Sequence, residues 1–278
     1  MSNDLKCPNC TTINPATNSV CKQCGINLKS AIETAMVVAQ EHFANAIAML
    51  RSADEGKIDD ALKLNAASEV ALAIKKSSAP FPSAHALLAT LWNELGNDDR
   101  AELHADIALK ENPYEFRAQL IKIDLTLKGV KIINLRPGDF VYFDRENYGK
   151  DAVDQVFGKV VGSAFGTVSK SIGTIFAAGS AVASQNKFVN EVEKLISIYK
   201  INCAKETDRD EYLMMAETML GLADMLFKEP SMRSIRNKVW MAVAETVPVK
   251  LYQAGNDKEI QNVRRRAEGR LALVAVPK

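Results

Sequence analysis

The sequence predicts a mainly α-helical protein that begins with a small metal-binding module, continues through paired helices and one β-hairpin, and ends in a helical bundle. Three observations carry this expectation. Four of the five cysteines fall within the first 24 residues. Long stretches rich in alanine and leucine carry apolar residues at helical spacing. The composition, 47% hydrophobic and 25% charged over 278 residues, is that of an ordinary globular protein.

Charge and the first residues narrow the function classes. The chain carries 35 Lys and Arg against 34 Asp and Glu, a net charge of +1. No global field therefore draws it toward nucleic acid or acidic lipid, and any such binding must be local. The first six residues lack the apolar stretch of a secretory signal, so we expect a cytoplasmic protein.

The first element is a pair of cysteine knuckles, Cys7–Cys10 and Cys21–Cys24. In a reducing compartment this spacing indicates a metal rather than disulfides. Each Cys-x-x-Cys pair aims two thiolates at one point, and two such knuckles about ten residues apart complete a tetrahedral S4 site for Zn²⁺. Four thiolates leave no open coordination position, so we expect one structural zinc per chain.

The residues around these cysteines make the prediction more specific. The segment contains Cys7-Pro8-Asn9-Cys10, Asn14-Pro15, Cys21-Lys22-Gln23-Cys24-Gly25 and the apolar Leu28. On these residues it resembles the short zinc ribbon at the start of many bacterial and archaeal proteins. The resemblance covers about residues 5–30, so residues 1–30 are assigned to a zinc ribbon.

Two alternatives exist for the knuckles. Their spacing also resembles the Ran-binding type of zinc finger, in which some members bind single-stranded RNA through aromatic and arginine side chains. Here Leu5 stands where that family has tryptophan, and the knuckles contain neither arginine nor an aromatic residue. Nucleic acid is therefore not favoured. Redox chemistry is the other alternative, and no thioredoxin-like βαβ pattern accompanies the cysteines.

Residues 31–128 are expected to form helices. Counted from Pro82, one stretch resembles the 34-residue tetratricopeptide repeat at Ala89, Trp92, Gly96, Ala101, Ala105, Ala108 and Pro113. Gly96-Asn97 suits the turn between two closely packed helices, so Gly96→Val is expected to force a side chain into that turn. Gly56 and Ala61 mark a degenerate upstream copy, and residues 116–128 match only the first helix of another. The resemblance implies protein–protein interaction; the alternative is a helical bundle without a ligand.

Residues 129–187 are the least regular part. Residues 130–143 hold two β-branched and aromatic runs around Pro137-Gly138, which predicts a β-hairpin. Residues 156–183 then carry Gly158, Gly162, Gly166 and Gly173 in a glycine-zipper-like pattern. Three interpretations stay open for this segment: a buried small-residue helix, an amphipathic helix on a membrane, or a mobile linker.

Residues 188–278 are expected to form a C-terminal bundle of four helices, near 188–201, 208–227, 232–247 and 258–276. Its expected core includes Trp240, lone Cys203 and four methionines, Met214, Met215, Met219 and Met225. The cluster Arg264-Arg265-Arg266 with Arg270 is interpreted as a solvated face, with an acidic partner as the alternative.

No nucleophile, base or open metal position recurs at recognisable spacing, so we do not expect an enzyme. His42, His85 and His104 are scattered over expected helices without metal or triad spacing. The resulting hypothesis is a zinc-binding adaptor that contacts an unidentified protein partner through its helical repeats. The alternative is a membrane-associated protein that uses residues 156–183.

Overall fold

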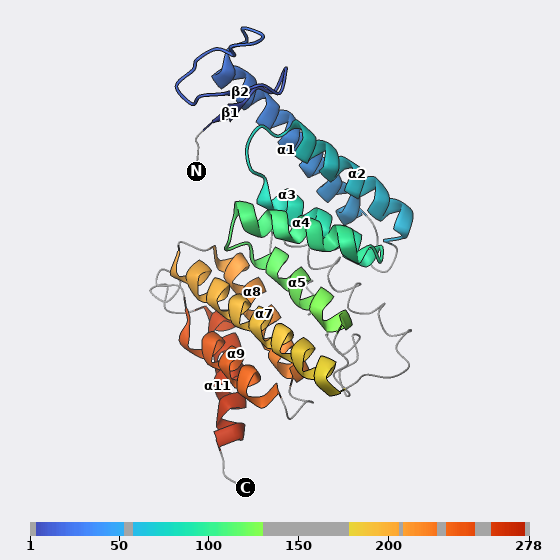
Figure 1. The fold of residues 1–278 in the computed structure, drawn as a ribbon. Coiled ribbons are helices and arrows are strands. Elements are labelled where there is room, and N and C mark those ends of the chain that lie inside the picture. The colour runs from blue at the N-terminus through green and yellow to red at the C-terminus, as the bar shows by residue number, and fades with distance from the viewer. Residues whose placement is uncertain are drawn as a thin grey trace.

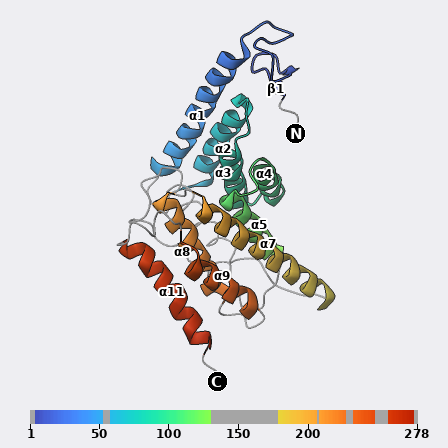
Figure 2. The ribbon, with the colours of Figure 1, turned by 90° about the vertical axis from the view of Figure 1, so that its left-hand side faces the viewer.

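The computed structural model describes residues 4–52, 58–129, 178–205, 208–226, 232–247 and 257–275. These residues form a mainly helical array, as predicted, with a small antiparallel hairpin and the cysteine cluster at its N-terminal end (Figure 1). Figure 2 shows the same order from the side, with the hairpin at one end and the last helix at the other. The strands are β1 (Leu5–Lys6) and β2 (Ile13–Asn14), and the helices are α1 (Leu28–Ser52), α2 (Asp60–Lys76), α3 (Pro82–Glu94), α4 (Asp98–Glu111), α5 (Phe116–Gly129), α7 (Ala178–Ala204), α8 (Arg209–Leu226), α9 (Arg233–Glu245) and α11 (Lys258–Ala275).

The helices of the N-terminal half pack as neighbours along the chain. Contacts join α1 to α2, α2 to α3, α3 to α4, and α5 to both α3 and α4. Local signals set the helix starts: the Asp59 side chain accepts a hydrogen bond from the Leu62 amide, and Pro82 occupies the first turn of α3. Alanines allow the close approach of α3 and α4, since Ala101, Ala105 and Ala108 are completely buried.

The turn between α3 and α4 lies where the repeat-like positions predict it. Gly96 has φ +74°, the Asn97 amide donates to the Trp92 carbonyl at 2.8 Å, and the Gly96 amide donates to the Asn93 carbonyl at 3.2 Å. These two bonds form a Schellman motif. A Cβ at Gly96 would meet nothing within 4 Å. The expectation that a side chain here is forced between packed helices is therefore wrong, because the turn requires the positive φ and not the missing volume.

The fifth helix, α5, joins two hydrophobic cores. Its Ala118 and Ile121 pack into the core of α1–α4, while Phe116, Leu120 and Ile123 pack into the core of the C-terminal helices. Gln119, also buried, donates to the Glu191 carboxylate of α7 at 2.8 Å and to its carbonyl oxygen at 3.0 Å. In the described part of the chain, α7 therefore packs on the face of α5 that carries Gln119.

The C-terminal bundle follows the predicted helix boundaries closely, except that α7 begins ten residues before the expected 188. Its central helix, α8, is buried over most of its length and carries the four predicted core methionines, Met214, Met215, Met219 and Met225. Trp240 and Cys203 are buried in the same core, as expected.

Some predictions fall on the residues that the structure does not describe. The β-hairpin expected at 130–143 and residues 156–177 of the glycine-rich segment lie outside the described residues. The remaining 178–183 belong to α7. Across the described ranges, no helix combines the length and apolar character needed to cross a membrane.

Candidate metal centre

Each cysteine knuckle is a tight turn closed by a backbone hydrogen bond. The Thr11 amide donates to the Cys7 carbonyl, and the Gly25 amide donates to the Cys21 carbonyl, both at 2.9 Å. The residue after each second cysteine has positive φ, +71° at Gly25 and +61° at Thr11. Glycine adopts this conformation freely, whereas a β-branched threonine is strained in it. The two knuckles therefore share one geometry, and only the second has the residue that suits it.

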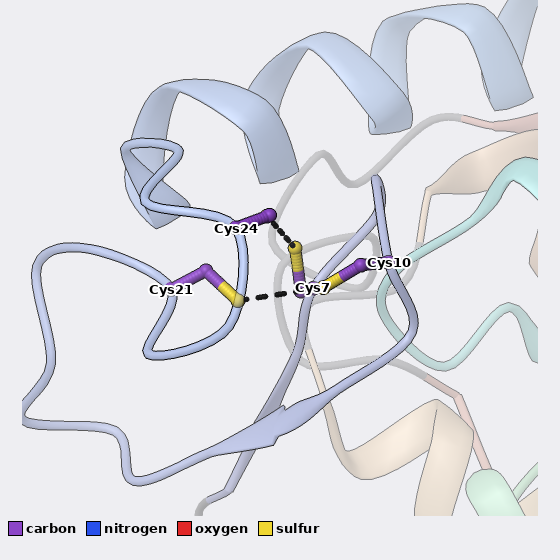
Figure 3. A group of neighbouring side chains, drawn as sticks. All are labelled: Cys7, Cys10, Cys21 and Cys24. Carbon is purple, nitrogen blue, oxygen red and sulfur yellow. Dashed lines mark hydrogen bonds between the residues drawn. The ribbon is translucent and has the colours of Figure 1, made fainter.

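The four sulfur atoms converge on one point (Figure 3). All lie within 4.8 Å of one another, with 3.6 Å between the Sγ atoms of Cys7 and Cys24 and 3.5 Å between those of Cys10 and Cys21. Four thiolates bound to one tetrahedral zinc at about 2.3 Å lie about 3.8 Å apart. Cys7, Cys10, Cys21 and Cys24 therefore fit a metal ion as the sequence predicts, with no position left over for a substrate.

The surroundings of the sulfur atoms favour mixed protonation. Although burial opposes its ionisation, hydrogen bonds from the backbone amides of Cys24 and Gln23 lower the pKa of Cys21 to about 6. A hydrogen bond from the backbone of Ile26 also lowers the pKa of Cys24. Burial raises the pKa of Cys7 to about 11. Binding of a metal at neutral pH must therefore release the Cys7 proton, because the thiolate is the ligand.

Asn14 ties the two knuckles together, a role that the sequence analysis missed. Its side chain is fully buried. The amide oxygen accepts from the Lys22 backbone at 2.9 Å, while the amide nitrogen donates to the Thr12 carbonyl at 2.9 Å and lies 3.6 Å from the Cys21 sulfur. The sequence analysis gave Asn14 only as part of the ribbon signature, whereas in the structure it ends β2. Asn14 is seven residues from Cys21 in the sequence, so no short-range pattern predicted their contact.

The ribbon has a very small apolar core. Leu28, the first residue of α1, is fully buried against Cys7 and Cys21, and Ile32 packs beside it one turn later. Three aliphatic side chains of the ribbon stay substantially exposed, Ile13, Val20 and Ile26. So little buried area cannot fold the module by itself, and a metal ion bound by the four cysteines would supply the stabilisation that the core lacks.

Two of the three histidines, which are scattered in the sequence, meet in the fold, and the third pairs with a carboxylate. His42 Nδ1 lies 2.8 Å from a Glu69 carboxylate oxygen. His85 and His104 meet across α3 and α4, with 3.0 Å between their Nδ1 atoms. Burial lowers the pKa of both, to about 4 for His104, where the charges of His85 and Arg100 add to the effect. Sequence spacing could not reveal this pair, because it depends on how the two helices face each other.

The basic cluster of the last helix is largely paired. Arg266 binds Glu217 of α8 at 2.7 Å, and Arg270 lies 3.3 Å from Asp224 of the same helix. Arg264 pairs with Glu268 within α11 at 3.1 Å. The contacts to Glu217 and Asp224 join α11 to α8, so Arg266 and Arg270 belong to the bundle rather than to a free basic face.

Comparison of the chain with protein-family models, with curated proteins and with the structures of solved proteins finds no match.

Proposed function

We propose that this protein is a non-enzymatic zinc-binding adaptor that binds a protein partner through its helical repeats in a reducing, cytoplasmic compartment. The observation that carries the proposal is the closed cluster of Cys7, Cys10, Cys21 and Cys24 at the end of an array of paired helices. A tetrathiolate site stabilises a fold and offers no open position for catalysis. An array of helix pairs offers long surfaces for another protein.

Zinc is the metal that this donor set fits best. Four thiolates in a tetrahedral arrangement select Zn²⁺ or iron among the common ions, and paired knuckles with backbone amides aimed at the sulfurs are typical of structural zinc. Metal analysis of protein freshly purified from a reducing cytoplasm should find one zinc per chain. Cys10→Ser should lose it and unfold the ribbon while the far-ultraviolet helical signal persists. Cys203→Ser, at a buried cysteine far from the cluster, is the matched control and should retain the zinc.

The repeat-like helices supply the binding surface. The paired helices expose several large aliphatic side chains, among them Val37 of α1, Leu64 of α2 and Leu103 of α4, each about half exposed. Side chains of this kind have no role in the core, so replacing them changes the surface without changing the fold.

Partner binding is tested with these exposed positions. The full chain is used as bait in its native lysate, and recovered proteins are identified and their amounts compared between variants. A partner of the helical repeats should be recovered by the wild type and lost with Leu64→Lys or Leu103→Lys. Leu273→Lys, at an exposed leucine of α11 outside the repeats, should keep it. Recovery of no partner by the wild type, or equal recovery by all variants, would contradict the adaptor function.

A further inference from the structure

Two side chains of a type that can bind metal ions, His85 and His104, meet in the α3–α4 pair, far along the chain from the cysteines. His85 projects from α3 and His104 from α4, and their Nδ1 atoms are 3.0 Å apart. The ring centroids are 5.2 Å apart, with 29° between the ring planes. The two rings therefore meet edge to edge, each presenting the same nitrogen to the other.

A carboxylate stands behind one of the rings. Glu111 Oε1 lies 4.0 Å from His85 Nε2, on the side away from His104. The other carboxylate oxygen of Glu111 accepts a 2.8 Å hydrogen bond from the Phe81 amide, which holds the group in place. A carboxylate on this side favours the tautomer with the proton on His85 Nε2, and so leaves the Nδ1 lone pair directed at His104. Histidines that bind metals almost always donate a hydrogen bond from the second nitrogen, and Glu111, at 4.0 Å, is the group placed to accept one after a small movement of the ring.

The spacing of the rings suits a shared metal ion. Two imidazole nitrogens bound to one tetrahedral ion at 2.0–2.1 Å lie about 3.3 Å apart, and their ring centroids about 5 Å apart. The centroids of His85 and His104 already stand at this separation. A rotation of both rings, with little movement of the helices, replaces the direct nitrogen contact with two metal–nitrogen bonds. The side chain of His85 is 9% exposed and that of Glu111 23% exposed, so the cluster lies at the edge of the core.

We infer that His85 and His104 bind a divalent transition-metal ion of the class that prefers imidazole, Zn²⁺, Ni²⁺ or Cu²⁺, through their Nδ1 atoms. Water completes the coordination sphere, and Glu111 orients His85 as a positioning residue. The bound ion joins α3 to α4. This site is independent of the cysteine cluster and does not require the adaptor function.

Nickel is the probe, because it binds imidazole ligands well and the thiolate site of the proposed zinc-binding protein already holds zinc. The full chain without an affinity tag, with one zinc in the ribbon, is titrated with Ni²⁺ by calorimetry at pH 7.5. We expect one further ion per chain. His85→Gln and His104→Gln each remove one of two ligands and should weaken binding at least about tenfold, and Glu111→Gln should weaken it about 10- to 100-fold. His42→Gln, at the histidine paired with Glu69, is the matched control and should bind as the wild type does.

Two readouts separate loss of the site from loss of the fold. Ni²⁺ should raise the melting temperature of the wild type but not that of His104→Gln, while the zinc content of every variant stays at one ion. In the wild type, paramagnetic Ni²⁺ should broaden the proton resonances of two of the three histidine rings. Absence of binding beyond the ribbon zinc, equal binding by the glutamine variants, or broadening of the His42 ring would overturn the inference.

Discussion

The turn at Gly96 gives a prediction whose size follows from the structure. An L-residue with φ near +74° is in the left-handed region, which costs about 1–2 kcal/mol for residues other than glycine, with asparagine the mildest. Because a Cβ at this position meets nothing within 4 Å, no steric clash adds to this cost. Alanine also lowers the conformational entropy of the unfolded chain, which stabilises the folded state by about 0.4–1 kcal/mol and offsets part of this cost. Gly96→Ala should therefore reduce the free energy of unfolding by about 1 kcal/mol.

The matched variant is Gly96→Asn, which tolerates the left-handed region and should cost a few tenths of a kcal/mol at most. Urea unfolding followed by circular dichroism measures both differences. Amide hydrogen exchange at Asn97, which donates to the Trp92 carbonyl, reports the turn locally. A loss well above about 3 kcal/mol for alanine would mean that the side chain meets packed atoms. Equal losses for alanine and asparagine would refute the argument from backbone conformation.

Three further predictions concern the ribbon and the helix contacts. Thr11→Gly relieves a β-branched residue at positive φ and should tighten zinc binding by about 1 kcal/mol, measured by competition with a chelator. The Arg209 guanidinium lowers the pKa of Asp257 below its unfolded value. The stability that this ion pair contributes is therefore present above about pH 4 and is lost as the pH falls through the folded pKa. Asp257→Asn should thus lower stability by up to about 1 kcal/mol at pH 7, and by progressively less as the pH falls through the folded pKa of Asp257, which urea unfolding at a series of pH values measures. Gln119→Ala removes the buried donor to Glu191 and should cost about 1–3 kcal/mol in urea unfolding, whereas a loss near zero would mean that α5 and α7 are joined by apolar contacts alone.

Local sequence signals predicted most of the helical architecture. Pro82, the Gly96-Asn97 pair and Pro113 bracket α3 and α4, and the helices appear at those bounds. The cysteine knuckles were equally readable, because each places its own two ligands within four residues. Such features depend on interactions inside one turn or one helix, so residues that are close in the sequence determine them.

Most of the features that the sequence did not predict involve residues that meet across elements. His85 and His104 are 19 residues apart, and their contact depends on the rotation of α3 against α4. Gln119 and Glu191 are 72 residues apart, so the covering of α5 by α7 had no local sign. The early start of α7 at Ala178 was missed for another reason: its first residues are small and uncharged, and they continue a glycine-rich composition that does not by itself predict a helix.

The metal module and the helical array are joined by one helix. The Leu28 amide donates to the Ser19 carbonyl at 2.9 Å, and the Asn27 side chain accepts from the Ser30 amide at 3.1 Å, so the ribbon itself caps α1. Leu28 is also the main apolar side chain in contact with Cys7 and Cys21. A metal ion bound by the knuckles would therefore also fix the first turn of α1, and α1 in turn supplies the apolar residue that the knuckles lack. Since α1 packs along α2, the ribbon is joined to the helix pairs through packed helices.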